Sequence, residues 1–411
     1  LFYLFFLALI GIPVLTIEFS IGRASQKSTA KAYQELEPRG TKWHLHSNFA
    51  IAGNYILLMF YTTVAGWMLY YFYKFAVGGF VGLDTANVKN TFNNLLASPA
   101  TMTFWMLVVL GFGVCSLGLQ KGVEKITKVM MTALLGLIII LAIHAVRLDG
   151  GIDGVKFYLL PNFEKIQEVG FFKLITTAMN QAFFTLSIGM GSMMIFGSYI
   201  DKSRTLLGES INIALLDTFV AIIAGLIIFP SCFAFNVEPD SGPSLIFITL
   251  PNVFTSMKGG RIWGSLFFLF MTFAAFSTVI ALFENILTCC VEKFNITRKK
   301  AVLINIIIIS VLSLPCVFGF NILSSLHPLG GESTILDFED FLVSNLILPA
   351  GSLMYLFFCI SKRGWGFDNY LKEANTGVGP KIPRWIKPYY KYVMPIIMLI
   401  LLIQGIVNTF I

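Results

Sequence analysis

Charged residues are scarce in this sequence. Only 12% of its 411 residues are Asp, Glu, Lys or Arg, whereas a soluble protein carries about 25%. Histidine occurs four times and cysteine six times, and neither shows C-x-x-C or other metal-ligand spacing. This predicts no metal cluster and argues against a metalloenzyme, which would need clustered histidines or paired acids. Glycine-rich phosphate loops, a soluble domain and low-complexity tails are also lacking, which argues against a nucleotide-binding domain.

What the chain has instead is long hydrophobic runs. Hydrophobic residues make up 56% of it, and Lys128–Val146 alone is long enough to cross about 30 Å of hydrocarbon. A membrane β-barrel would alternate apolar and polar residues in segments of about ten, whereas these runs are continuous. The sequence therefore predicts an all-α polytopic membrane protein, with one transmembrane domain over residues 1–411.

The runs predict ten membrane-spanning segments, at roughly 1–22, 47–77, 101–119, 126–147, 171–200, 207–231, 261–291, 301–320, 338–360 and 392–411. One alternate set of loops comprises residues 23–46, 120–128, 201–206, 292–300 and 361–391. These loops hold 21 of the 29 Lys and Arg residues. Because positive charge marks the cytoplasmic side, we expect these loops inside and both chain ends outside. The net charge of +7 therefore comes from loops that lie at the membrane surface, and we expect no nucleic-acid partner.

Two connecting segments have enough pattern for a prediction of their own. The inner loop Ser20–His44 predicts a basic surface helix at the headgroup layer. The outer loop Asn236–Gly260 contains an apolar stretch too short to span, which predicts a re-entrant or surface helix pair.

One predicted span contains residues that disfavour a continuous helix. The stretch NQAFFTLSIGMGSMM (Asn180–Met194) places Thr185, Ser187 and two glycines at its centre. Hydroxyl side chains divert backbone hydrogen bonds, and each glycine weakens a helix by about 1 kcal/mol relative to alanine. A break over 185–191 would free carbonyls for a hard cation and a helix N-terminus for a carboxylate. Close helix packing through small residues is the alternative interpretation.

Two acids lie within predicted spans, where a charge is costly and marks a functional site by default. Asp217 could supply an anionic oxygen to a cation, or it could accept a hydrogen bond near a helix end. Glu284 is a further intramembrane acid, or it lies near the inner end and pairs with a basic loop.

Two further spans contain hydroxyl groups at depth. Ser277 and Thr278 follow Ala274 by one turn, which places two hydroxyls near its carbonyl and forms an oxygen cluster suited to sodium. Ordinary hydroxyl bonds to the preceding turn are the alternative. Tyr61 lies deep in its segment, where a phenol hydroxyl needs a partner.

Three stretches resemble the neurotransmitter:sodium symporter family. They are LIGIPVLTIEFSIGR (Leu9–Arg23), NQAFFTLSIGMG (Asn180–Gly191) and LLDTFVAIIAGLIIFP (Leu215–Pro230). The most specific feature is QAFFTLSIGMG with Asp217 placed 32 residues after Thr185. The resemblance covers nearly the whole chain and implies a LeuT-like inverted-repeat fold, with family helices two to eleven present. It implies a sodium-coupled symporter that works by alternating access, and not an enzyme.

The resemblance also implies roles for individual residues. The first sodium site would use Thr185 and Asp217, and the second would use Ala274, Ser277 and Thr278. The residues expected to bind substrate are Leu57, Tyr61, Val64, Phe184, Thr185, Ser187, Met190, Thr278, Ala281 and Leu282. The expected gates are Phe184 and Asp340 on the outside, and Tyr199 and Glu292 on the inside. Tyr61 would hydrogen-bond the substrate carboxylate.

The substrate and ions follow from the same positions. Met190 offers a flexible, polarizable wall, which favours a neutral hydrophobic or aromatic amino acid. Another small amine or osmolyte is the alternative, and an ion channel, which needs repeated polar rings, is the alternative from a different class. By the resemblance, Tyr3, Gln181 and Thr185 match parts of the family's chloride position. The negative charge of Asp217 and the missing hydroxyl at Ala221 predict that chloride is not required.

We expect sodium ions, the amino acid and the lipid bilayer as partners, no organic cofactor, and a bacterial cytoplasmic membrane as the location. The sequence starts in mid-helix at Leu1, without Met. The resemblance implies that a preceding helix completes both sodium sites and supplies an Arg partner for Asp340. We therefore expect that the chain as written cannot complete a transport cycle, whereas its full-length parent can.

Overall fold

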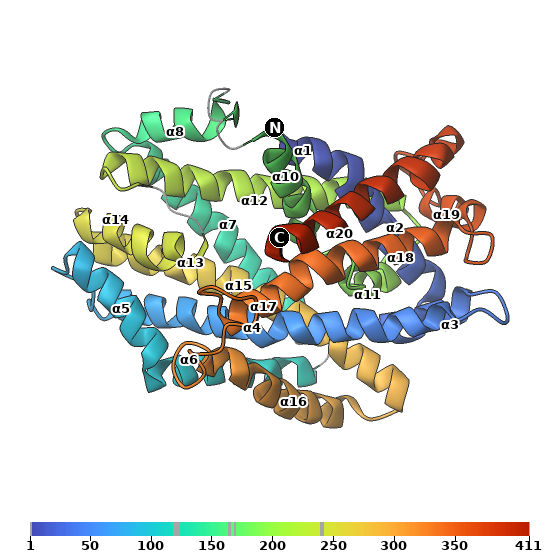
Figure 1. Ribbon diagram of the computed structural model, residues 1–411, viewed down its shortest axis with the longest axis horizontal. Helices are drawn as coiled ribbons and strands as arrows, with labels where there is room; N and C mark the ends of the chain where they lie inside the picture. Colours follow the sequence, from blue (N-terminus) through green and yellow to red (C-terminus); the bar gives the residue numbers. More distant parts are fainter. Residues whose placement is uncertain (1, 118–123, 163–165, 168–169, 239–241, 411) are drawn as a thin grey trace.

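The computed structural model describes residues 2–117, 124–162, 166–167, 170–238 and 242–410, and within these it is a helical bundle without strands. Figure 1 shows its α-helices, several of them running along the long axis of the molecule. In chain order they are α1 (Phe2–Phe6), α2 (Ile12–Ser25), α3 (Thr29–Leu36), α4 (His46–Ala76), α5 (Thr85–Ala97), α6 (Pro99–Gly111), α7 (Glu124–Val146), α8 (Gly151–Leu159), α10 (Phe171–Thr185), α11 (Ser192–Tyr199), α12 (Leu206–Ala234), α13 (Gly242–Ser244), α14 (Leu250–Ser256), α15 (Gly260–Phe294), α16 (Arg298–Phe318), α17 (Ile335–Phe341), α18 (Leu348–Ile360), α19 (Phe367–Ala374) and α20 (Met394–Phe410).

Short π- and 3₁₀-helical segments join some of these helices into longer rods, for example Leu7–Gly11 between α1 and α2 and Leu342–Ile347 between α17 and α18. Among the described residues, nine rods are long and apolar enough to span a membrane. They are Phe2–Ser25, Trp43–Ala76, Pro99–Ser116, Glu124–Val146, Leu206–Ala234, Gly260–Phe294, Arg298–Phe318, Ile335–Ile360 and Arg384–Val407. Each overlaps one predicted span, and the tenth predicted span is the one that is broken.

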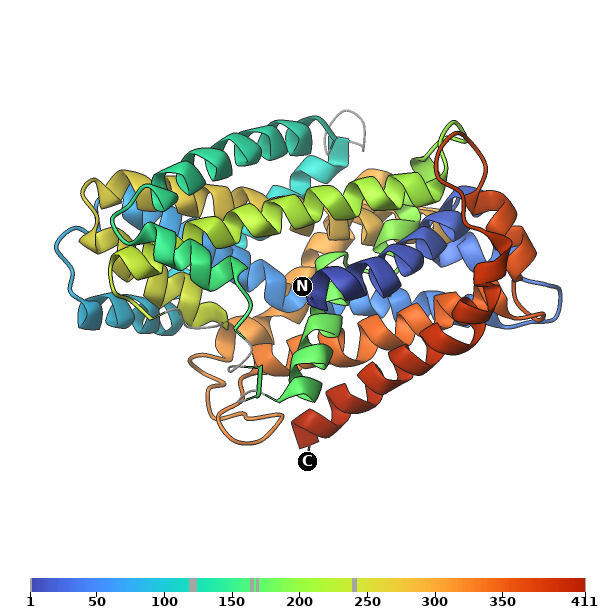
Figure 2. The same cartoon turned by 90° about the horizontal axis from the view of Figure 1, so that it is seen from above.

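The basic loops gather at one end of the bundle. Figures 1 and 2 place α3 and α19, which lie in two of the predicted cytoplasmic loops, at the same end of the long axis. The outer segments α5 and α14 lie at the opposite end. The predicted alternation of inner and outer loops therefore agrees with the arrangement of the helices.

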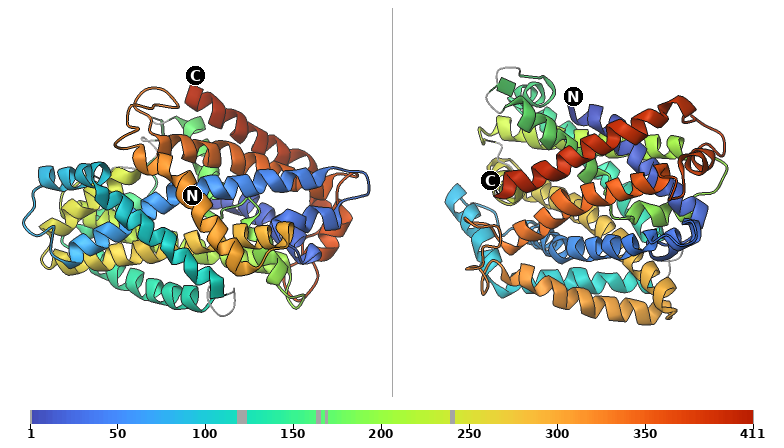
Figure 3. Two further views of the ribbon diagram at one scale, coloured as in Figure 1. Left: turned by 90° about the horizontal axis from the view of Figure 1, so that it is seen from below. Right: turned by 45° about the vertical axis from the view of Figure 1, so that its right-hand side comes forward.

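Two buried cores lie side by side in the bundle. One is formed mainly by α4, α6, α7, α15 and α16, with α4 packed along α15. The other is formed by α2, α10, α11, α18 and α20, with α2 packed along α11. Figure 3 shows α6 and α16 on one flank and α20 crossing over the second core. Met190 belongs to the first core and Ile188 to the second, so the stretch after α10 lies where the two cores meet.

Both loop predictions need correction. The α3 helix is not a solvated surface helix, since Ala32 and Tyr33 are fully buried and the Tyr33 hydroxyl bonds His46 Nδ1 at 2.8 Å. Residues 242–256 form one continuous helical segment instead of a helix pair, and residues 239–241 lie outside the described part. Tyr71 of α4 holds this segment by donating its hydroxyl to the Phe247 carbonyl at 2.8 Å.

Candidate functional site

The tenth predicted span is interrupted in its middle. α10 ends at Thr185 and α11 begins at Ser192, so the predicted break is confirmed at 186–191. Three residues there have left-handed backbone: Ser187 with φ 49°, Gly189 with φ 103° and Gly191 with φ 72°. Glycine is required at 189 for a second reason, because a Cβ there would lie 2.2 Å from the Leu348 carbonyl oxygen.

A buried acid of α2 stabilises the unwound backbone. Unpaired peptide groups cost several kcal/mol in hydrocarbon, so an unwound stretch needs internal partners. The Glu18 carboxylate is fully buried and accepts a hydrogen bond from the Gly189 N–H at 2.5 Å. It also faces the N–H groups of Gly191 and Met193. Glu18 therefore satisfies the Gly189 donor that the break releases, and it lies beside two further N–H groups at the start of α11.

An amide of α4 stabilises the same stretch from the other core. Asn54 donates to the Met190 carbonyl at 2.9 Å and accepts from the Ser192 hydroxyl at 2.9 Å. Asn285 of α15 donates to the same Asn54 oxygen at 3.1 Å. From α3, the Thr29 hydroxyl donates to the Gly191 carbonyl at 2.8 Å. The unwound backbone is thus hydrogen-bonded to four surrounding helices, α2, α3, α4 and α15, directly or through Asn54.

A small cavity of about 220 Å³ lies against the break. Its lining residues are Leu57, Tyr61, Gln181, Phe184, Thr185, Ser187, Met190, Thr278, Val343 and Leu348. Seven of the ten predicted substrate-binding residues are among them. Val64, Ala281 and Leu282 do not line the cavity, and Gln181, Val343 and Leu348 line it without having been predicted to bind substrate.

The first predicted ion group is assembled across two helices. The Thr185 hydroxyl at the end of α10 donates to the Asp217 carboxylate of α12 at 2.6 Å. The Tyr3 hydroxyl is buried beside this pair, within electrostatic reach of Asp217, and has no hydrogen-bond partner among the described residues. Thr185 also lines the cavity, so one side chain joins the acid to the proposed substrate position.

The second predicted ion group converges on one carbonyl of α15. The Ser277 and Thr278 hydroxyls donate to the Ala274 oxygen at 2.8 Å and 3.3 Å. Thr278 lies next to Tyr61 and lines the cavity with it. These hydroxyl bonds to the preceding turn are the ones that the alternative interpretation of the sequence predicted. They also bring three oxygens, of Ala274, Ser277 and Thr278, close together on the helix.

Of the two predicted outer gate residues, Phe184 lines the cavity and Asp340 does not. The Phe184 ring is 38% exposed at the cavity wall, at the end of α10. Asp340, in α17, accepts a hydrogen bond from the Ser344 hydroxyl at 2.8 Å.

The predicted inner gate residues lie close to an ion pair. Glu292 accepts from the Ser28 amide and hydroxyl at 3.0 Å and 2.7 Å, which ties α15 to the start of α3. Tyr199 is 58% exposed and interacts electrostatically with Glu292, Glu284 and Arg298. Glu284 itself is bonded to Arg298, so the sequence alternative that paired it with a basic loop is the correct one.

The comparison with known proteins decides the family. The sequence model of the sodium:neurotransmitter symporter family matches residues 80–410 of this chain. The chain belongs to this family. A sodium-dependent transporter of Bacillus subtilis, YhdH, is 33% identical over 87% of this chain and 78% of its own. A sodium-dependent transporter of Haemophilus influenzae is 28% identical over 97% of this chain and 88% of its own. The crystal structure of MhsT in complex with L-phenylalanine matches with a TM-score of 0.87 and 32% identity, over 98% of this chain and 90% of that one.

Family membership confirms the coarse predictions. The chain has the LeuT-like inverted-repeat fold with its broken helix, and it is a multi-pass membrane protein of a sodium-coupled symporter family. The family is one of transporters, which points to a protein that is not an enzyme.

Three structural residues of the site were missed at the sequence level. Glu18 carried a usable signal, since an acid inside a predicted span marks a functional position by default. Asn54 and Arg23 had weaker signals, because the first is uncharged and the second sits at a span end where basic residues are common.

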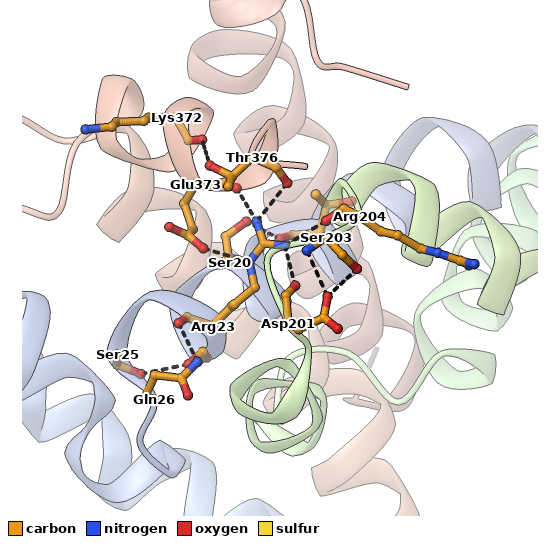
Figure 4. A network of polar contacts seen from close by, with 12 residues as sticks. Ser20, Arg23, Ser25, Gln26, Asp201, Ser203, Arg204, Lys372, Glu373 and Thr376 are labelled. Atoms are coloured by element: carbon orange, nitrogen blue, oxygen red, sulfur yellow. Dashed lines mark hydrogen bonds and ion pairs between the residues drawn. The ribbon is translucent and has the colours of Figure 1, made fainter. Parts of the chain in front are cut away.

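Arg23 organises the end of the bundle at which the basic loops gather (Figure 4). It is fully buried, and its Nε donates to Glu373 Oε1 at 2.7 Å. Its Nη1 donates to the carbonyls of Asp201 and Arg204 at 3.2 Å and 2.8 Å. Its Nη2 donates to the carbonyls of Glu373 and Thr376. One guanidinium therefore joins α2, the loop after α11 and the end of α19, which uses the fixed fork of five donors that lysine lacks.

Proposed function

We propose that the protein imports a neutral amino acid with a hydrophobic or aromatic side chain, coupled to the entry of sodium. The single observation that carries the proposal is the cavity beside the break, where the Thr185–Asp217 pair and Tyr61 meet an apolar wall. At about 220 Å³ it is smaller than the roughly 300 Å³ at which drug-sized pockets begin, which suits a small solute.

The charge of the lining argues for a neutral substrate. None of the residues that line the cavity is Asp, Glu, Lys or Arg. An acidic side chain would find no cation there, and a basic side chain would find no carboxylate, and each would lose its hydration. A zwitterion needs only compensation at its backbone groups. In the proposed binding mode its carboxylate meets the Tyr61 hydroxyl and a sodium ion held by Asp217 and Thr185.

The apolar wall argues for a hydrophobic side chain. Leu57, Met190, Val343 and Leu348 come from α4, the break and the α17–α18 rod, so they enclose the cavity from several helices. Methionine adapts its shape to different ligands, which favours a medium or large side chain over one fixed size. A small amine or osmolyte remains the alternative substrate.

In the proposed cycle, sodium and substrate bind from outside and Phe184 closes over them. One helix group then rocks against the other, and the inner end opens near Tyr199 and Glu292. A charge that moves down a 100 mV potential releases about 2.3 kcal/mol, so one or two sodium ions suffice for concentrative uptake. The proposed location is a bacterial cytoplasmic membrane.

Chloride is not required in this proposal. Asp217 already places a negative charge beside the first ion position, and a chloride ion about 5 Å away would be repelled by about 3 kcal/mol at an effective dielectric constant of 20. Ala221, one turn further along α12, offers no hydroxyl to bind an anion. Uptake that rises when gluconate is replaced by chloride would refute this part.

The test is uptake of labelled L-phenylalanine by the protein in proteoliposomes, compared with uptake after sodium is replaced by potassium. We expect saturable uptake that needs sodium and that L-leucine and L-tryptophan inhibit. Glutamate and lysine should not inhibit it. Dopamine competing better than leucine or tryptophan would overturn the substrate class, and flux that neither saturates nor needs sodium would overturn the carrier.

The Tyr61 hydroxyl gives a sharper test of the binding mode. Tyr61→Phe removes one hydrogen bond to a charged group, worth about 1.5–3 kcal/mol, so we expect KM to rise about 10- to 100-fold with little change in thermal stability. Tyr70→Phe is the matched control, because Tyr70 lies on the same helix and does not line the cavity. Equal KM values for the two variants would contradict the proposed role.

A further inference from the structure

A second, larger hollow lies on the flank of the bundle, away from the substrate cavity. It has a volume of about 740 Å³ and is formed by α4, α15 and α16, which pack against one another. Its walls include Ile51 and Met59 of α4, Cys290 and Lys293 of α15, and Asn305 and Ile308 of α16. In Figure 1 α16 lies along the lower edge of the molecule and α4 runs above it. We call this hollow the flank groove.

The flank groove faces lipid. The side chains of Ile304, Ile308 and Leu312 on its α16 wall are 45%, 37% and 38% exposed, and they lie within a rod long enough to span the membrane. No acidic residue lines it, and its single charged lining residue is Lys293. Most of its lining side chains are apolar, so burying a hydrocarbon chain against them is favourable.

The length of the flank groove matches one leaflet. Its α4 wall runs from Asn48 to Met59, which is about 17 Å at 1.5 Å per residue. This is about half of the roughly 30 Å hydrocarbon core. The Lys293 end is the cytoplasmic end, because α15 ends there and the basic loop 292–300 follows. The groove therefore runs from the inner membrane surface to about the bilayer centre.

The mouth of the flank groove carries uncompensated positive charge. Lys293 Nζ donates to the Asn48 side-chain oxygen at 2.6 Å, which uses one of its three donors and leaves two free. Lys299 and Lys300 are exposed in the first turn of α16 and do not line the groove. Among the described residues no carboxylate lies within ion-pair distance of these three lysines, whereas the neighbouring Arg298 is neutralised by Glu284.

We propose that the flank groove is a binding site for one anionic phospholipid of the cytoplasmic leaflet, with an acyl chain along α4 and α16 and its phosphate on Lys293. The apolar lining selects the chain, the length selects one leaflet, and Lys293 selects an anionic headgroup over a zwitterionic one. The site is separate from the substrate cavity, so it stands whatever the protein transports. Its helices also carry Asn54 and Asn285, which hold the break, so a bound lipid would stabilise the packing that supports the substrate site.

Cys290 is a built-in reporter of occupancy. It lines the flank groove and is partly exposed, whereas the other five cysteines are buried. The experiment compares the rate of N-ethylmaleimide labelling of the intact protein in nanodiscs of phosphatidylglycerol with that in nanodiscs of phosphatidylcholine. Mass spectrometry counts the label, and Cys290→Ala identifies the site. One lysine at an anionic membrane surface corresponds to about a fivefold preference, so we expect labelling about fivefold slower in phosphatidylglycerol.

Two variants separate headgroup selection from general solvation. Lys293→Gln should remove the difference between the two lipids, and Lys381→Gln, on a cytoplasmic loop and outside the groove, should preserve it. Both changes are at exposed residues, so both variants should fold. Equal labelling rates in the two lipids, or a difference that survives Lys293→Gln, would overturn the proposal, because lipid would then fill the hollow without selection.

Discussion

Replacing Gly189 by alanine tests whether the break is a packed, fixed structure. Gly189 has φ 103°, and its backbone packs directly against the backbone of α18 at Leu348 and Gly351. A Cβ at Gly189 would lie 2.2 Å from the Leu348 oxygen and 2.8 Å from the Leu348 Cα. In the other direction, a Cβ at Gly351 would lie 1.8 Å from the Gly189 oxygen. Neither neighbour is a flexible side-chain end, so the backbone itself would have to move.

The cost of Gly189→Ala follows from two contributions. Left-handed backbone costs an L-residue about 1–2 kcal/mol, and overpacking costs about 1–3 kcal/mol. Together they destabilise the folded transporter by about 2–5 kcal/mol, which shifts the unfolding equilibrium about 30- to 5,000-fold. The same strain should lower sodium-coupled uptake, because the break carries Ser187 and Met190 of the cavity wall.

The assay is thermal unfolding followed with a dye that fluoresces on reaction with thiols. All six cysteines are free and five are buried, so dye reaction reports unfolding. Gly136→Ala is the control: Gly136 lies inside α7, and its added Cβ meets no atom within 4 Å. Alanine is favoured there by about 1 kcal/mol. If Gly189→Ala unfolds at the same temperature as Gly136→Ala and transports normally, the argument for a packed break is refuted.

Three further predictions concern other parts of the chain. Asp217→Asn should raise the sodium concentration for half-maximal uptake about 10- to 100-fold, since a charge-assisted contact contributes about 1.5–3 kcal/mol; an unchanged sodium dependence would contradict it. Arg23→Gln breaks a buried ion pair, which costs about 3–5 kcal/mol, and we expect the lower figure because the Glu373 side chain is 13% exposed. Thermal unfolding and proteolysis of loop 361–391 measure the loss of stability. An unfolding temperature and a rate of proteolysis equal to those of the wild type would count against this role. Hydrogen bonds from Ser203 lower the pKa of Asp201 in the folded state, so this turn is stabilised above the ordinary carboxyl pKa of about 4 and loses that stabilisation as the pH falls further. Asp201→Ala should therefore speed hydrogen exchange at the Ser203 amide at pH 7, and this acceleration should shrink as the pH falls below the ordinary carboxyl pKa of about 4, after correction for intrinsic rates. An acceleration of the same size at every pH would speak against the linkage.

The local chemistry of the broken span was readable from the sequence. Two glycines and two hydroxyl residues within Thr185–Gly191 weaken a helix wherever they occur, so they predicted a break at this place, although these residues alone did not exclude close helix packing. The pairing of Thr185 with Asp217 followed only from the resemblance, because 32 residues separate them and no local rule joins α10 to α12.

Burial of the inner loop could not be read in the same way. The Ser20–His44 segment is polar enough to predict a solvated helix, yet Tyr33 is fully buried against Tyr355 and Phe358. The helix is short, and its environment is set by α18, more than 300 positions away in the chain. Hydrophobic pattern reports which face is apolar, and it does not report which distant element covers that face.

The sequence by itself determined the quantities that depend on neighbouring residues along the chain. These are the approximate positions of the spans, the alternation of basic loops with loops of little charge, and the position of the break, because hydrocarbon thickness, backbone hydrogen bonding and membrane charge act on each segment separately. Only the tertiary structure decided what satisfies the broken backbone, namely the Glu18 carboxylate and the Asn54 amide, and which side chains enclose the cavity. Those contacts join residues from α2, α4, α10 and α15, and their geometry is fixed only when the helices pack.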